Sequence, residues 1–288
     1  MNRLPSEKRT QILAALTNGA GINATARQTG ASHVTILKLL ADAGTAVLAY
    51  QRAALVNLPC KRIQCDEIWS FISCKEKRIP RDERGRGRGD VWTWTALCED
   101  TKLIPCWHVG ARDADAGYLF MEDLASRLAS RVQLTTDGHN AYLSAVESAF
   151  GWNGIDYAML IKLYGPSIDG PTRYSPPEIV GIERHWVMGS PDMDRVSTSF
   201  VEASNMTMRQ NIRRLTRLTN GHSKKLPNHV HAMSLWFMAY NFCRKHTTLT
   251  KAARGVHTTP AMAAGVTDHV WKISEVVGLL DIAEQVAA

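Results

Sequence analysis

Residues 62 to 73 read RIQCDEIWSFIS, a stretch in which apolar and polar side chains alternate. Two more stretches of this kind follow closely, DVWTWTALCED at 90 to 100 and KLIPCWHVGAR at 102 to 112. A period of two with β-branched and aromatic residues is typical of half-buried strands. The three stretches therefore predict an antiparallel meander, which begins soon after residue 58.

The elements that follow the meander suggest a fold class. An amphipathic helix is predicted over 113 to 130, a short buried strand over RVQLTTD at 131 to 137, and a second helix from about His139 to Phe150. Three meander strands, a helix and a fourth strand that ends in an aspartate are the element order of a ribonuclease-H-like fold. We therefore expect an α/β core of this kind, a mixed sheet flanked by helices, over residues 58 to 247.

The second half of this core carries a long connection and two helices. Residues 165 to 198 are rich in proline and glycine and have no clear period, which predicts a long loop. Helices are expected over about 197 to 219 and 228 to 246. An alanine-rich C-terminal tail, 248 to 288, carries no chemistry that its residues indicate.

The first 50 residues predict a small all-α domain. Residues 6 to 44 are typical of three short helices, with a turn at Gly30 to Ser32 between the second and the third. Gly30 suits a left-handed turn and Ser32 suits a helix N-cap. This spacing indicates a helix-turn-helix. Val34, Leu37 and Leu40 are expected to face inward, while the side chains that would face a DNA major groove are His33, Thr35 and Lys38. A three-helix unit without a nucleic-acid partner is the alternative.

Composition limits the class of protein. The chain has 288 residues, 45% of them hydrophobic, and a formal net charge of +7, which favours a polyanionic partner. We expect no membrane span and no signal peptide, because no apolar run approaches 18 residues and the N-terminus has no apolar core region. These features predict a cytoplasmic, bacterial-type protein associated with the nucleoid. The six cysteines include no CxxC pair, so neither a disulfide framework nor a zinc site is expected.

Three carboxylates are placed to meet in the predicted core: Asp66 in the first strand, Asp137 at the end of the fourth, and Glu202 on the helix after the long connection. Strands one and four are neighbours in a ribonuclease-H-like sheet. Crowded carboxylates repel unless cations hold them, and oxygen ligands suit Mg²⁺ or Mn²⁺. Two such ions can activate an attacking oxygen and stabilise a leaving one in phosphoryl displacement.

The helix that bears Glu202 is also the start of the most basic segment. Asn205 and Arg209 fall near the helix face of Glu202, and Val201, Met208, Ile212 and Leu215 form a separate apolar stripe. The basic side chains expected to contact DNA here, together with Asn205, are Arg209, Arg213, Arg214 and Arg217.

Each carboxylate also has an ordinary structural interpretation. Asp66 suits a strand edge, Asp137 a helix N-cap, and Glu202 the first turn of a helix. Glu183 in GIERHW is an alternative third ligand, but Gly189 and Pro191 would end a helix soon after it. We therefore favour Glu202.

Three stretches resemble the DDE transposases of bacterial insertion sequences, most closely the insertion-sequence-one family. They are IQCDEIWSFI, TTDGHNAY, and VEASNMTMRQNIRRLTR with the AMSLWFMAYNFCRKH that follows it, between about residues 58 and 247. The resemblance implies that Asp66, Asp137 and Glu202 are catalytic metal ligands for two Mg²⁺ or Mn²⁺ ions, with Asn205 and Arg209 beside them. It also implies a helix-turn-helix that recognises terminal inverted repeats, cleavage of double-stranded DNA and its transfer to target DNA, and a homo-oligomer.

Three alternatives remain open, one of which is a degenerate, inactive copy of such an element. A non-catalytic helix-turn-helix regulator needs the DNA-binding residues but not the carboxylates. A ribonuclease-H-like nuclease cuts DNA without joining it to a target.

Overall fold

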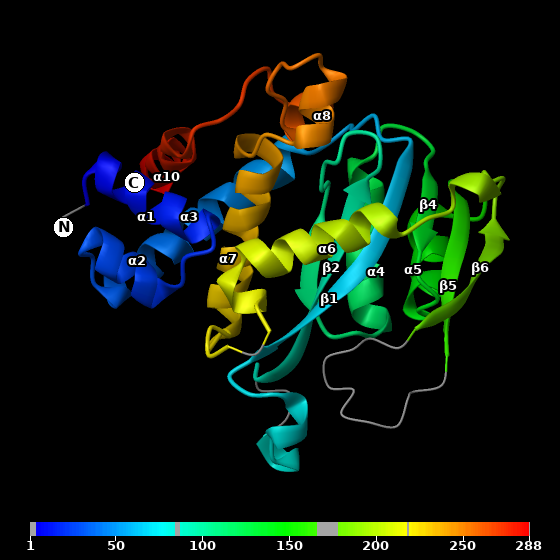
Figure 1. Cartoon of the computed structure of the whole chain (residues 1–288), viewed down its shortest axis with the longest axis horizontal. Helices are drawn as coiled ribbons and strands as arrows, with labels where there is room; N and C mark the ends of the chain where they lie inside the picture. Colours follow the sequence, from blue (N-terminus) through cyan, green and yellow to red (C-terminus); the bar gives the residue numbers. More distant parts are fainter. Residues whose placement is uncertain (1–3, 84–86, 166–177, 218, 288) are drawn as a thin grey trace.

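The computed structural model describes residues 4–83, 87–165, 178–217 and 219–287, with side chains as far as residue 283 (Figure 1). A six-stranded mixed sheet has the order β3-β2-β1-β4-β5-β6. The strands are β1 (Arg62–Ile72), β2 (Gly89–Cys98), β3 (Trp107–Gly110), β4 (Gln133–Thr136), β5 (Asp156–Tyr164) and β6 (Ile179–Met188).

The predicted meander is confirmed. β1 pairs antiparallel with β2 along its length, and β2 pairs antiparallel with β3. β4 returns parallel to β1, with Gln64 opposite Thr135, so Asp66 and Asp137 end up on adjacent strands. The β1 to β2 connection carries 3₁₀ turns at Glu76–Arg78 and Arg81–Glu83. This mixed sheet flanked by helices is compatible with a ribonuclease-H-like core.

Helices cover both faces of the sheet (Figure 1). On one face α4 (Ala114–Arg127) packs beside α5 (Ala141–Phe150), with Phe120 and Tyr142 buried against β1 and β2 residues such as Cys65 and Trp94. On the other face α6 (Ser199–Asn211) crosses β1 and β2, and α7 (Leu226–Met238) continues as a π-helical turn, Ala239–Cys243. The sheet therefore separates two apolar clusters, and β1 contributes to both.

Two predictions for the second half of the core are wrong in part. Of the long loop expected at 165 to 198, residues 166–177 lie outside the described residues, and the remainder contains β6 over Ile179–Met188, followed by a 3₁₀ turn at Met193–Arg195. β6 is an edge strand exposed over most of its length, so it carries no burial period that sequence reasoning could detect. The basic helix expected to reach 219 ends at Asn211, and a 3₁₀ turn, Arg213–Leu215, follows.

The three N-terminal helices form at the predicted places: α1 (Ser6–Thr17), α2 (Ile22–Thr29) and α3 (His33–Ala54). Gly30 ends α2 in the left-handed conformation, and the Ser32 hydroxyl accepts the backbone N–H of Thr35 as the N-cap of α3. Val34, expected to face inward, is instead 77% exposed. The buried face of α3 begins at Ile36 and continues through Leu39 and Leu40.

α3 is much longer than a recognition helix needs to be, and it packs against α7. Its last half lies in the same apolar cluster as the sheet, and the C-terminal tail adds α8 (Thr247–Ala252), α9 (Pro260–Ala263) and α10 (Ile273–Ala287). α10 returns to contact α1 and α3. Among the described helices, α3 alone has the length and hydropathy to cross a membrane, and its Ile36, Leu40 and Val47 are buried in this core.

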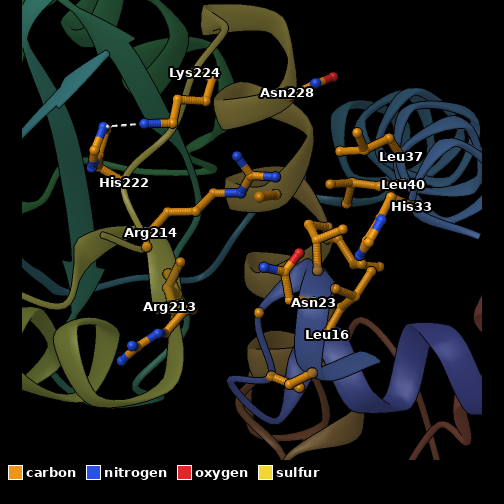
Figure 2. A pocket seen from close by; sticks show the side chains of 18 of the residues that line it. Leu16, Asn23, His33, Leu37, Leu40, Arg213, Arg214, His222, Lys224 and Asn228 are labelled. Carbon is orange, nitrogen blue, oxygen red and sulfur yellow. Dashed lines mark hydrogen bonds between the residues drawn. The ribbon is translucent and has the colours of Figure 1, made fainter. Parts of the chain in front are cut away.

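The turn between α1 and α2 abuts the end of α6. A Cβ added at Gly19 would lie 3.2 Å from the Asn211 carbonyl oxygen, and one at Gly21 would lie 3.3 Å from Arg213 Cγ. This close approach fixes the N-terminal helices against the basic segment and leaves a cleft between them (Figure 2).

Gly44 sets the distance between α3 and α7. A Cβ at this position would lie 2.5 Å from His231 Cβ, and Ser234 of α7 donates a hydrogen bond to the Gly44 carbonyl oxygen. Gly44→Ala should therefore lower the free energy of unfolding by about 1–3 kcal/mol, because overpacking exceeds the gain in helix propensity. Gly278→Ala in α10, where a Cβ would meet nothing within 4 Å, is the control and should stabilise by a few tenths to about 1 kcal/mol. Urea unfolding measures both, and equal shifts would contradict this account of the α3 and α7 contact.

Candidate metal centre

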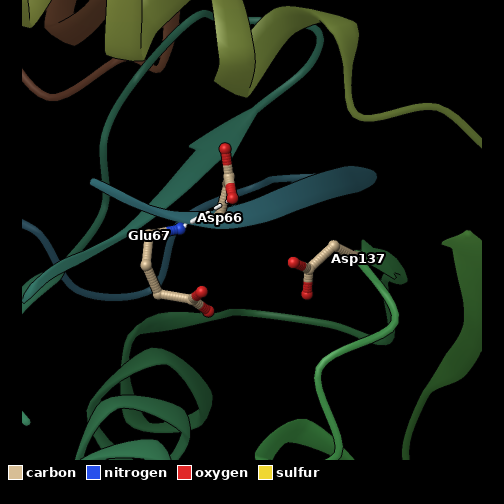
Figure 3. Close-up of side chains that lie close together, drawn as sticks. All are labelled: Asp66, Glu67 and Asp137. Carbon is tan, nitrogen blue, oxygen red and sulfur yellow. Dashed lines mark hydrogen bonds between the residues drawn. The ribbon is translucent and has the colours of Figure 1, made fainter. Parts of the chain in front are cut away.

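Three carboxylates come together between β1 and the end of β4 (Figure 3). One oxygen each from Asp66, Glu67 and Asp137 lies within 4.8 Å of the others. The parallel pairing of β1 with β4 places Asp66 beside Asp137, which follows the last residue of β4. This cluster could hold a metal ion.

Asp66 and Glu67 reach the cluster from opposite faces of β1, as adjacent strand residues must. Asp66 points towards α6, where Asn205 Nδ2 donates to Asp66 Oδ2 at 2.9 Å. Glu67 points towards α4 and α5, and its side chain is only 1% exposed. Asp137 accepts the backbone N–H of His139 through Oδ1 at 3.0 Å, which turns the chain into α5.

The cluster strongly disfavours its own negative charge. Burial raises the pKa of Asp66 to about 7, and the charges of Glu67 and Asp137 add to the effect. Burial and the Asp137 charge likewise raise the pKa of Glu67, although Arg112 opposes them. A cation bound here would remove this repulsion, which is the electrostatic condition for a metal site.

Arg112 supplies part of the missing positive charge. Its Nε lies 3.0 Å from Glu67 Oε2 and its Nη2 lies 3.4 Å from Asp137 Oδ2, while the guanidinium lies over the Trp92 ring. Arg112 lies two residues after the end of β3, so the meander brings a positive charge to the carboxylates of β1 and of the residue after β4.

Glu202 is positioned by a contact from β1. The Gln64 side-chain oxygen accepts the backbone N–H groups of Phe200 and Val201 at 2.9 and 3.1 Å, which caps the start of α6. Glu202 Oε1 accepts the Thr198 hydroxyl at 2.6 Å and is paired with Lys162 of β5. Its charge contributes to the raised pKa of Asp66, although it is not one of the three carboxylates within 4.8 Å.

The donor set fits a hard divalent cation. One buried oxygen beside the cluster, Asn205 Oδ1, has no hydrogen-bond partner among the described residues. Carboxylate and amide oxygens are the ligands that Mg²⁺ and Mn²⁺ prefer, and the cluster residues supply no sulfur or imidazole.

The predicted basic residues divide into two groups. Arg209 is half-buried on α6 and lies within electrostatic range of Asp66, and burial with the nearby Arg217 charge lowers its pKa to about 10. Arg213 and Arg214 lie beyond the end of α6 and line the cleft beside α1 and α2. The single basic face expected over this segment is therefore wrong, because the helix ends at Asn211.

His33, Thr35 and Lys38 do not share one helix face. His33 lines the cleft with Leu37 and Leu40, whereas Lys38 lies about 140° around α3 and is paired with Asp42. Thr35 bonds the Ser32 hydroxyl in the N-cap.

Glu183, the alternative third ligand, lies on β6. Its side chain is exposed and paired with His185 at 3.0 Å. Glu67, which sequence reasoning missed, follows Asp66 directly, and the alternation of β1 predicts that it points away from Asp66. Its carboxylate reaches the cluster because the longer side chain extends past the strand towards Asp137.

A scan against protein-family models and a comparison with curated protein sequences find no match to this chain.

The raised pKa of Asp66 predicts a pH-dependent stability. At pH values below 3.8, the ordinary pKa of aspartate, the carboxyl is neutral in both the folded and the unfolded protein. Between about pH 4 and pH 7 the folded protein keeps a proton that the unfolded protein has lost, so stability falls as pH rises. Above about pH 7 the buried charge costs up to about 4 kcal/mol. Asp66→Asn should therefore raise Tm at pH 8 without metal, with a smaller difference at pH 5, and it should abolish stabilisation by Mg²⁺.

The control is Asp115→Asn, an exposed aspartate at the start of α4. Thermal melts of both variants at the two pH values, with and without Mg²⁺, show whether the effect belongs to Asp66 or to the loss of any carboxylate. An Asp66→Asn effect that is the same at both pH values would contradict the assignment of the raised pKa.

Proposed function

We propose that this protein is a transposase that cleaves DNA at insertion-sequence ends and transfers the freed strand to target DNA. The observation that carries the proposal is the hydrogen bond between Asn205 and Asp66. It joins α6, which bears Glu202, to the strand whose carboxylate lies beside Asp137. Three elements distant in sequence thereby present acidic side chains to one region.

The residues that would hold two Mg²⁺ or Mn²⁺ ions are Asp66, Asp137 and Glu202, with Glu67 close enough to add a fourth carboxylate. When bound, the ions supply charge stabilisation of the attacking and leaving oxygens in phosphodiester displacement. Glu202 would need to exchange its contact with Lys162 for the ion.

The chain's own side chains would orient and neutralise the reacting groups. Asn205 holds the Asp66 carboxylate towards α6. Arg112 offsets the charge of Glu67 and Asp137, and Lys162 lies next to Glu202, where its ammonium can contact a phosphate oxygen. Arg209 adds positive charge near Asp66 for the DNA backbone, and Arg217 adds more beside Arg209.

The expected partners are the double-stranded terminal inverted repeats and the target DNA. The exposed faces of α2 and α3 would bind the repeats, as in the predicted helix-turn-helix. We expect a homo-oligomer, because two element ends must be handled together.

Cleavage of a plasmid that carries candidate element ends tests the proposal, with labelled ends and a target plasmid to detect joining. Asp137→Asn and Glu202→Gln should each lower Mg²⁺-dependent cutting and joining by at least about 100-fold, because loss of residues that merely orient metal ligands already costs 10–100-fold. Both variants should still bind DNA. Glu183→Gln, an exposed carboxylate on β6, is the matched control and should retain activity.

Other outcomes identify the alternatives. Cutting without joining would indicate a nuclease. DNA binding without cutting, unchanged by Asp137→Asn, would indicate a regulator. Full activity in Glu202→Gln would remove Glu202 from the site.

A further inference from the structure

A cleft of about 610 Å³ lies between the helix-turn-helix and the segment that follows α6 (Figure 2). One wall is formed by the end of α1, by α2 and by the first turns of α3, and the other by residues 212–214, residues 220–224 and α7. The walls are held at a fixed distance by Gly19 and Gly21, which contact the chain at Asn211 and Arg213. The cleft is therefore part of the packed structure.

The charged side chains in the lining are basic: Arg27 of α2 on one wall, and Arg213, Arg214 and Lys224 on the other. No carboxylate lines the cleft, and within the described ranges no ion pair neutralises these four cations. Like charges facing one another across a cleft repel, so a polyanion between them would be bound favourably.

The Arg214 side chain is held in position in the cleft wall by a chain of hydrogen bonds. Its Nη1 donates to Ser223 Oγ at 3.1 Å, and Ser223 Oγ lies 2.8 Å from His229 Nδ1. Burial lowers the pKa of His229 to about 3, so the imidazole stays neutral, and burial lowers the pKa of Arg214 to about 10, so the guanidinium keeps its charge at neutral pH. The Arg214 side chain projects across the cleft towards α2 and α3 (Figure 2).

The rest of the lining suits a sugar–phosphate chain. The lining between the basic side chains includes the half-buried Leu16, Ile22 and Leu37, which can pack against deoxyribose, while Asn23 and Asn228 offer amide groups to phosphate oxygens. Cations combined with apolar surface distinguish a backbone groove from a site for a free inorganic anion.

The cleft is connected to the candidate metal centre by α6. Glu202 lies in the first turn of this helix and Arg213 two residues after its end, and eleven residues at 1.5 Å each place them about 16 Å apart along the axis. Phosphates of B-DNA advance about 3.4 Å per base pair along the axis. A duplex that follows α6 would therefore place in the cleft a phosphate about four or five base pairs from one at the carboxylates.

We propose that this cleft binds the DNA backbone and holds the duplex at a fixed distance from the cleavage site. Binding of the backbone stands on the cleft alone, whereas the distance to the cut rests on the proposed function.

Binding is tested with the full chain and a short duplex of arbitrary sequence, without metal, over a range of salt concentrations. The double variant Arg213→Gln with Lys224→Gln and the single variant Arg27→Gln remove charge from opposite walls, and all three side chains are exposed. The double variant should weaken Kd at least about tenfold and reduce the slope of log Kd against log salt by about 2, and Arg27→Gln should reduce it by about 1. Arg52→Gln, an exposed arginine of α3 outside the cleft, controls for net charge.

Unchanged slopes in both cleft variants, or equal changes in Arg52→Gln, would overturn the proposal. Inorganic phosphate that displaces the duplex as effectively as a second duplex at equal phosphate concentration would also overturn it, in favour of a simple anion site. These measurements need no cleavage, so a protein that fails to cut still gives a result for the cleft.

The distance is tested in the cleavage reaction with single methylphosphonate substitutions along the duplex. A neutral phosphate about four or five base pairs from the cut should impair wild type but not the double variant. Equal sensitivity at every position would overturn the fixed distance. Backbone binding would still be decided by the salt dependence, and the proposed function by cleavage and joining.

Discussion

The cap that Gln64 places on α6 is the contact on which the site depends. A helix begins with backbone N–H groups that have no partner within the helix, and here the buried Gln64 side chain, near the start of β1, accepts two of them. This contact holds the start of α6 over β1, two residues from Asp66 on the strand and one from Glu202 on the helix. Asn205, three residues on, can then reach the Asp66 carboxylate. The relative position of helix and strand is thus determined by polar contacts, with the apolar stripe of α6 closing the interface behind them.

Around this contact the structure places several carboxylates close together, with few positively charged side chains to neutralise them. Asp66, Glu67 and Asp137 share one small region in which burial raises the pKa of Asp66 and Glu67. Arg112 and Lys162 approach from the two flanks and pair with carboxylates of the site or beside it. The repulsion that remains, with the unpartnered Asn205 oxygen beside it, is the electrostatic condition under which a cation could bind here.

The helix α6 ends within the basic segment, where two apolar residues become buried. Ile212 adopts an extended conformation and, with Leu215, inserts into the cluster beneath α6 and α7. Because α6 ends at Asn211, Arg209 stays near the carboxylates, whereas Arg213 and Arg214 line the cleft beside α1 and α2. The basic segment therefore contributes to two separate surfaces.

The sequence by itself determined the features that local periodicity and turn chemistry encode. The alternation at 62 to 73 predicted β1, Gly30 and Ser32 predicted the turn and cap before α3, and the element order placed Asp66 beside Asp137. Only the tertiary structure decided that Glu67 joins them, that Glu202 pairs with Lys162, and that β6 forms within 179–188. The physical reason is the range of the interactions: a strand period or a cap is a property of a few adjacent residues. An exposed edge strand, a helix end chosen by burial and a cleft between distant segments depend on partners that the local sequence does not contain.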